Sequence, residues 1–119
     1  MNLYNWDEMM GEEISELLTR RYISGERLTL ARFTLRKGCL VATHSHANEQ
    51  LSTVLTGALR FIVNGDEVIV RSGETLHIPP NTPHSAEAVE DTDALDAFAP
   101  VRGDWIEGRD DYLRGKPSA

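Results

Sequence analysis

The chain has 119 residues, carries a formal net charge of -7 and is 40% hydrophobic. This length suits one domain with a single core, and the acidic balance argues against a nucleic-acid partner, whose phosphates call for an excess of Lys and Arg. The single cysteine, Cys39, excludes an internal disulfide, so nothing in the sequence demands an oxidising compartment.

The N-terminal region is predicted to lead into the first strand. Residues 1–10 contain Asp7 and Glu8 but no apolar run or basic start, so we expect no signal peptide and no membrane span, and therefore a cytoplasmic protein. Residues 6–18 place apolar side chains among acids at a spacing that predicts a short helix or turn.

Short strands are predicted from about residue 20 to residue 100. The turn at Gly25 joins runs 20–23 and 27–35 as a hairpin, and Asn64-Gly65 is a strong signal for a two-residue hairpin. Further strands are expected at 51–55, 58–63, 67–70, 75–78, 84–89 and 94–99. Short strands bounded by glycine, proline or acidic residues predict an all-β antiparallel barrel or jelly roll.

Two histidines end a short apolar run near the middle of the chain. On a strand, Ala42, His44 and His46 would share one face, and two adjacent imidazoles form half of a metal site. Gln50 has the same parity, which favours it as a further ligand over Glu49. A bulge between His46 and Gln50 would reverse that choice, because one extra residue turns every later side chain to the other face.

A third histidine, His84, follows Pro79 and Pro80, which end ladder pairing and fix a bend before a new extended run. Three histidines at two motif-like spacings favour a metal site over scattered surface residues. We expect His77 at the surface or an interface, since its parity differs from that of its apolar neighbours Leu76 and Ile78.

Three imidazoles and an amide oxygen would leave a divalent ion with its full charge, which favours an anionic or chelating substrate. Such ligands accommodate nickel, zinc, iron, manganese or cobalt, so the sequence does not identify the metal. Asp96, Phe98 and Arg102 can line one pocket, with Arg102 binding a carboxylate. Their spacing equally allows a surface ion pair between Asp96 and Arg102, with Phe98 in the core.

The motifs resemble those of the cupin superfamily. Gly38, His44-x-His46, Gln50 and Gly57 resemble its first motif, with glutamine where glutamate is usual. Gly73, Pro79 and His84 resemble its second motif, with Asn81 where glycine is usual. The resemblance implies a single-domain double-stranded β-helix, or jelly-roll barrel, spanning residues 1–119, with its core at about 20–100 and a C-terminal tail at 101–119.

A narrower resemblance is to the small KdgF-type cupins of pectin and alginate breakdown, which open 4,5-unsaturated uronate monosaccharides to a linear keto form. It rests on the histidine motifs and on the Asp96-x-Phe98-x-Pro100-x-Arg102 ending. This resemblance implies an isomerase-type or lyase-type enzyme that takes a small anionic sugar. The metal ligands it implies are His44, His46, Gln50 and His84, and the catalytic residues are Asp96, Phe98 and Arg102.

Two other functions remain open on the same barrel: an Fe(II)-dependent dioxygenase, and a sugar-binding or sensor protein without catalysis. The polar tail after Pro100 carries the large apolar residues Trp105, Ile106, Tyr112 and Leu113, so we expect it to pack over the barrel mouth or a neighbouring subunit. The apolar surface left on so small a barrel favours a homodimer.

Overall fold

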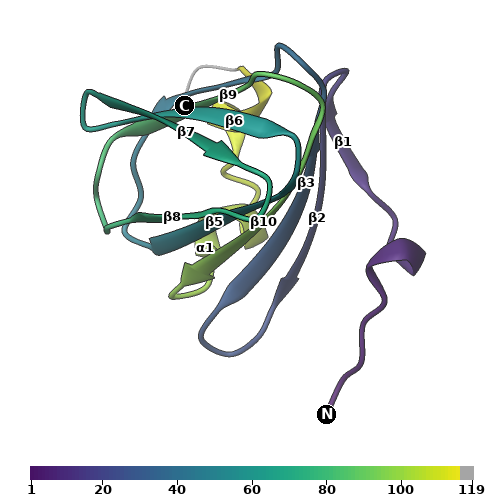
Figure 1. The fold of residues 1–119 in the computed structure, drawn as a ribbon. Coiled ribbons are helices and arrows are strands. Elements are labelled where there is room, and N and C mark those ends of the chain that lie inside the picture. Colours follow the sequence, from purple (N-terminus) through teal and green to yellow (C-terminus); the bar gives the residue numbers. More distant parts are fainter. Residues whose placement is uncertain (116–119) are drawn as a thin grey trace.

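A computed structural model describes residues 1–115 and shows a barrel made of two antiparallel sheets (Figure 1). The elements, in chain order, are η1 (Trp6–Glu8), β1 (Glu12–Ser15), β2 (Leu18–Ser24), β3 (Thr29–Leu35), β4 (Leu40–His44), β5 (Glu49–Thr56), β6 (Ala58–Val63), β7 (Asp66–Arg71), β8 (Thr75–Ile78), β9 (His84–Ala88), β10 (Thr92–Ala99), α1 (Gly103–Ile106) and η2 (Asp111–Arg114). The predicted all-β jelly-roll class is confirmed.

Within the described residues, one sheet has the strand order β1-β2-β3-β10-β5-β8 and the other has the order β4-β9-β6-β7. Most neighbours in these sheets are far apart in sequence, because β10 lies between β3 and β5 and β9 lies between β4 and β6. Because strands from distant parts of the chain are interleaved in this way, residues 44, 84 and 96 all lie at the interior of one barrel.

The barrel interior is filled by alternate residues of its strands. In β10, Thr92, Ala94, Asp96 and Phe98 are buried while the residues between them are partly exposed. Side chains of a strand alternate between two faces, so this pattern gives β10 one inward face. On that face Asp96 is the one charged group, beside the apolar Ala94 and Phe98.

Turn chemistry sets the connections between the strands. Asn64 and Gly65 both have positive φ, as the predicted two-residue hairpin between β6 and β7 requires. Gly57 also has positive φ, and a Cβ there would collide with the carbonyl oxygen of Asp91. Glycine is therefore needed at position 57 both for its backbone conformation and for space.

The N-terminal region differs in part from the prediction. A short 3-10 helix does form at Trp6–Glu8, but residues 12–15 form strand β1 instead of continuing a helix or turn. The reason is tertiary: β1 pairs with β2, and this pairing buries Ile14 in the core. Contacts with a neighbouring strand override a weak local preference.

The C-terminal segment, residues 101–115, packs against its own barrel. Trp105 and Leu113 are only 4% and 8% exposed and join the hydrophobic core. Residues 116–119 of the predicted tail lie outside the described residues. No helix within residues 1–115 is long and apolar enough to cross a membrane.

Several large apolar side chains stay exposed on this single chain, among them Leu28, Leu40, Leu51, Leu55, Ile62 and Ile106. They include outward residues of β5. The expected homodimer stays a prediction.

Candidate metal centre and active site

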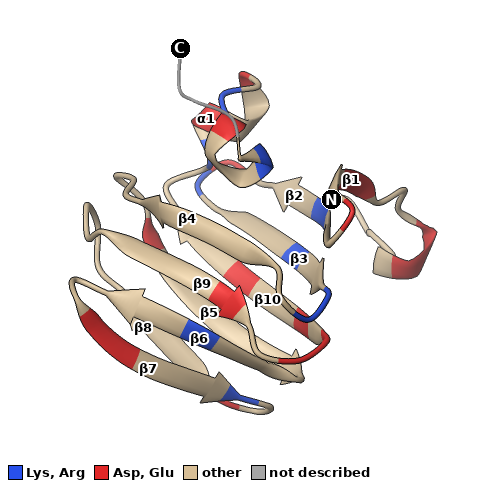
Figure 2. Ribbon diagram, turned by 90° about the horizontal axis from the view of Figure 1, so that it is seen from above, with Lys and Arg blue, Asp and Glu red and all other residues tan. Residues whose placement is uncertain are grey.

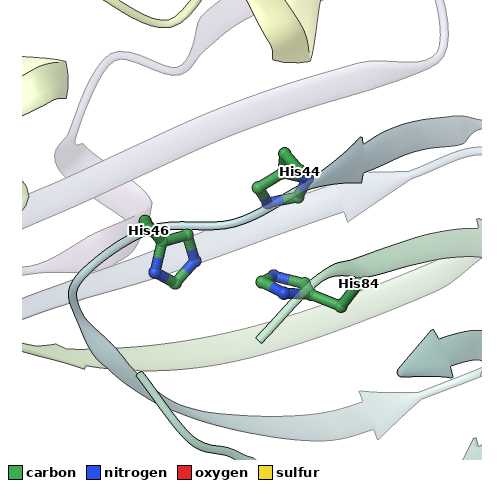
Figure 3. Close-up of side chains that lie close together, drawn as sticks. All are labelled: His44, His46 and His84. Atoms are coloured by element: carbon green, nitrogen blue, oxygen red, sulfur yellow. The ribbon is translucent and has the colours of Figure 1, made fainter. Parts of the chain in front are cut away.

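Two paired strands and one loop bring three histidines together. His44 ends β4 and lies opposite His84, which begins β9, while His46 follows in the loop before β5. Their ligand nitrogens all lie within 4.8 Å of one another, and the three rings surround a common space (Figure 3). These histidines are close enough to hold one metal ion.

Strand β4 departs from regular alternation just before His44. It pairs Val41 with Ala86 and His44 with His84, so the register shifts between these pairs. Val41 and His44 both line the interior cavity, whereas Ala42 is exposed. The expectation that Ala42 shares a face with His44 is wrong, because this irregularity redirects the later side chains, as β-bulges do.

The hydrogen bonds of the imidazoles fix their tautomers. Each ring places Nδ1 beside the backbone carbonyl of the residue two positions away, at 2.7 Å for His44, 3.0 Å for His46 and 2.8 Å for His84. A carbonyl oxygen only accepts hydrogen bonds, so Nδ1 carries the hydrogen and Nε2 of each neutral ring is bare. A bare Nε2 with Nδ1 held by a carbonyl is the usual arrangement of a metal-binding histidine.

Burial keeps the three rings neutral. It lowers the pKa of His44 and of His46 to about 4 and the pKa of His84 below its ordinary value, and the positive charge of Arg102 acts in the same direction. The Nε2 atom of His84 is buried and has no hydrogen-bond partner within residues 1–115. Buried acceptor atoms normally have a partner, so the Nε2 atom of His84 is available to bind a ligand such as a metal ion.

Gln50 enters the same space from β5. Its Nε2 donates to Ser52 Oγ at 2.8 Å and to Asp96 Oδ2 at 3.4 Å, which turns its Oε1 toward His46 Nε2, 3.0 Å away. With His46 in the tautomer described above, two hydrogen-bond acceptors face each other with no hydrogen between them. A cation between them would satisfy both, so the donor set fits a divalent metal.

Glu49, the alternative to Gln50, points the other way. It is exposed and lies on the outer face of β5, where its Oε2 is 2.8 Å from Nε2 of the exposed His77. The strand keeps its alternation from Glu49 onward, so the inward position belongs to Gln50. His77 lies at the surface of the chain, away from the other histidines.

Asp96 faces the histidines from the opposite sheet. It pairs with Ser52 on β5 and Ala31 on β3, and it lines the interior cavity. Its Oδ1 is buried and has no hydrogen-bond partner in the part of the chain that is described. Burial raises the pKa of Asp96 to about 7, although Ser52 and the charge of Arg102 act in the opposite direction.

Phe98 and Arg102 complete the wall beside Asp96. The Phe98 ring lies edge-on to His46 at 5.8 Å between ring centroids, and the Arg102 guanidinium lies 4.7 Å from the Phe98 ring. Both side chains are buried, so Arg102 is not part of a surface ion pair with Asp96. Asp104 instead binds Arg102 through two hydrogen bonds, of 2.9 Å to Nε and 2.8 Å to Nη2.

Sequence reasoning did not assign Tyr112 to the site. Its ring lies 4.4 Å from the His44 ring, and its hydroxyl accepts hydrogen bonds from Arg102 and Trp105. Burial raises the pKa of the Tyr112 phenol, so the hydroxyl keeps its hydrogen at neutral pH. The available signal was the presence of Trp105 and Tyr112 among large apolar residues in an otherwise polar tail.

The site residues other than His46 line one cavity of about 60 Å³. Its polar lining consists of His44, Gln50, His84, Asp96, Arg102 and Tyr112. The rest of the lining is apolar, including Phe33, Phe61 and Phe98. A charge that develops inside such a cavity is stabilised only by these few groups.

Comparison with known proteins places this geometry in a family. Residues 31–98, more than half of the chain, match the model of the Cupin domain family. Among curated relatives, the pectin degradation protein KdgF of Dickeya dadantii (strain 3937) is 25% identical over 103 residues, which are 84% of this chain and 94% of the relative.

Solved structures agree on the fold. The structure of KdgF from Halomonas sp. matches with a TM-score of 0.83 and 22% identity, covering 88% of this chain and 98% of that one. An RmlC-like cupin from Shewanella frigidimarina also matches with a TM-score of 0.83, at 24% identity, covering 88% of this chain and 96% of that one. The chain belongs to the cupin domain family, and the pectin degradation protein KdgF of Dickeya dadantii is among its relatives.

Proposed function

We propose that this protein is a metal-dependent enzyme that opens the ring of 4,5-unsaturated uronate monosaccharides and converts them to the linear keto form. The observation that carries the proposal is the placement of Asp96. Its buried Oδ1 has no partner within residues 1–115, and it lines the same cavity as His44 and His84. A free carboxyl oxygen beside a metal-binding set of imidazoles suits positioned proton transfer.

The similarity to a pectin degradation protein supports the choice of substrate class. Lyases that cleave pectin or alginate leave 4,5-unsaturated uronates, which combine a carboxylate, hydroxyl groups and an enol ether. Such a molecule can chelate a metal and pair with a buried arginine. The cavity of this chain offers both kinds of partner.

The proposed metal site consists of His44, His46, Gln50 and His84. All four side chains are neutral as ligands, so an ion bound there keeps its charge and supplies Lewis-acid stabilisation to substrate oxygens. The remaining steps belong to the side chains around it.

Asp96 is proposed to carry the proton. It takes the proton of the anomeric hydroxyl, whose O–H electrons form the C1 carbonyl while the bond between C1 and the ring oxygen breaks. The electron pair on the former ring oxygen then forms the C5 carbonyl, and the C4–C5 double bond takes the proton from Asp96 at C4. The sum is an isomerisation, which needs no oxidant or reductant.

Arg102 and Phe98 are proposed to hold the substrate. The guanidinium lies 4.7 Å from the Phe98 ring, and both are buried beside the histidines. The positive charge would fix the substrate carboxylate, while the ring would pack against the sugar and exclude water. A carboxylate held in this way would place C4 within reach of Asp96.

The test is the loss of the ultraviolet absorbance of an unsaturated uronate. Wild-type protein is expected to accelerate this loss, and Asp96→Asn is expected to slow it by about 10²- to 10⁴-fold, the usual contribution of positioned proton transfer. Asp93→Asn is the matched control, because Asp93 also lies on β10 but pairs with Arg32 outside the cavity, at 2.6 Å.

Full activity of Asp96→Asn would refute the role of this carboxyl group. Uronate binding without any turnover by the wild-type protein would instead favour the sensor or sugar-binding alternative. Oxygen consumption during turnover would favour the dioxygenase.

A further inference from the structure

Tyr112 lies inside the candidate site, ten residues after Arg102 along the chain. It belongs to η2, which packs against β4, and it falls outside the residues that match the family. Its ring lies 4.4 Å from the His44 ring, and it lines the same cavity as Asp96 and His84. Tyr112 therefore faces any molecule bound there.

The hydroxyl of Tyr112 has an unused hydrogen. It accepts a hydrogen bond of 2.6 Å from Arg102 Nη2 and one of 3.0 Å from Trp105 Nε1. Both partners can only donate, so these bonds use the lone pairs of the phenol oxygen and leave its own O–H group free. No acceptor for that O–H is found within residues 1–115, and buried hydroxyl groups normally have one.

Arg102 has a free donor next to this hydroxyl. Asp104 occupies its Nε and Nη2 with bonds of 2.9 and 2.8 Å, so the two-pronged edge of the guanidinium is already engaged. Nη1 makes no hydrogen bond to any described residue. Arg102 and Tyr112 are hydrogen-bonded to each other, and each keeps one free donor group: Nη1 of Arg102 and the O–H of Tyr112. A ligand carboxylate that enters the cavity can accept hydrogen bonds from both.

We propose that Tyr112 is a further substrate-binding residue, which donates its phenol hydrogen to the carboxylate of a uronate while Arg102 Nη1 binds the same group. This assignment rests on the proposed function for the identity of the ligand. It adds a residue from the C-terminal segment to the binding site, and it gives the carboxylate two donors where Arg102 alone would give one.

The test is calorimetric binding of galacturonate and of its methyl ester to the full chain at neutral pH. Galacturonate has no C4–C5 double bond, so binding is measured without turnover. Tyr112→Phe removes the O–H group and keeps the ring. It is expected to weaken galacturonate binding by roughly tenfold to a hundredfold, as loss of a hydrogen bond to a charged group does, and to change ester binding much less.

Tyr22→Phe is the matched control. Tyr22 contacts the same Trp105 ring, at 5.4 Å between centroids, but it is not part of the cavity lining, so its loss of a hydroxyl should leave both affinities unchanged. Thermal unfolding of each variant reports whether its fold is intact.

The outcomes separate this proposal from the one before it. If wild-type protein binds galacturonate and Tyr112→Phe binds it equally well, the role of Tyr112 is refuted while the proposed function stands. Tighter binding of galacturonate by Tyr112→Phe would also refute the role of Tyr112, since its hydroxyl would then oppose ligand binding instead of supporting it. If wild-type protein neither binds galacturonate nor converts unsaturated uronates, both proposals fail.

Discussion

Gln50 controls the charge of the candidate metal site. It is the fourth neutral group beside three neutral imidazoles, and its Oε1 lies 3.0 Å from His46 Nε2. A carboxylate at the same position would cancel part of the charge of a bound ion. The site should then hold the metal more tightly and the anionic substrate more weakly.

Gln50→Glu tests this expectation. We expect the affinity for a divalent metal, measured by competition with a coloured chelator, to rise by roughly tenfold or more, and galacturonate affinity to fall by a similar factor. The control is Glu49→Gln, the reverse change one residue earlier on the outer face of β5. Unchanged metal affinity in Gln50→Glu would remove position 50 from the ligand set.

Residue spacing predicted much of this site. Strand parity alone places Gln50 inside and Glu49 outside, because β5 alternates regularly. Strand parity gives the wrong face for Ala42, because the register shift in β4 cannot be recognised from the sequence. Tyr112 could not be assigned, since only the folded chain brings η2 against β4.

The C-terminal segment is fixed to the barrel by an ion network. Figure 2 shows acidic and basic positions on this segment and acidic positions on β1. Buried Arg20 on β2 binds Asp110 at 2.9 Å and Glu12 at 2.7 Å, and Arg114 also binds both carboxylates. Because Asp110 immediately precedes η2, the network holds Tyr112 over the site.

Asp110→Asn is expected to weaken this attachment. Burial acts to raise the pKa of Asp110, but hydrogen bonds and charges from Arg114 and Arg20 outweigh it and hold the pKa below its ordinary value. The buried Nε and Nη1 atoms of Arg20 have no partners among the described residues. The charge of Arg20 is therefore stabilised mainly by Asp110 and Glu12, which bind its Nη2. We expect a loss of about 1–3 kcal/mol in the free energy of unfolding at pH 7.

The sign of the pH dependence follows from the lowered pKa. The stabilisation from Asp110 is present at neutral pH and is lost as the pH falls from about 4 through the lower pKa of the folded state. Thermal unfolding followed by circular dichroism should show a shallower loss of stability in this acid range for Asp110→Asn than for wild-type protein. The pKa of Glu12 is also lowered through its hydrogen bond with Arg20. Asp110→Asn should therefore still lose some stability as the pH falls, because Glu12 is protonated in the same range.

Arg109→Gln is the control for this segment. Arg109 pairs with Glu107 at 2.7 Å, but both side chains are exposed, so the pair should contribute no more than about 1 kcal/mol. Equal stability of Asp110→Asn and wild-type protein at pH 7 would show that the network does not fix the segment.

The strands themselves were largely predictable. Glycine, proline and Asn-Gly turns marked their ends, and alternation marked their inner faces. Strand β1 was missed because Glu12–Ser15 has little strand character of its own and gains its conformation by pairing with β2. The interleaving of β9 and β10 between distant strands came from the family resemblance, since local patterns do not contain it.

The cavity at the candidate site is small at the scale of the whole molecule. The cavity holds about 60 Å³, which is room for an ion and a few water-sized groups, whereas sites for small organic ligands usually reach about 300 Å³ or more. A monosaccharide is larger than this cavity. Arg102 and Tyr112 of the C-terminal segment form part of the cavity wall and are hydrogen-bonded to each other.

If a metal held by the three histidines makes the barrel a uronate-opening enzyme, stepwise metal reconstitution should restore its activity. Protein stripped with a chelator is titrated with zinc or nickel while the ultraviolet absorbance of an unsaturated uronate is followed. We predict almost no rate without metal, a linear rise that ends near one ion per chain, and no rise in His84→Ala. Full activity in the stripped protein, or an equal rise in His84→Ala, would contradict the account.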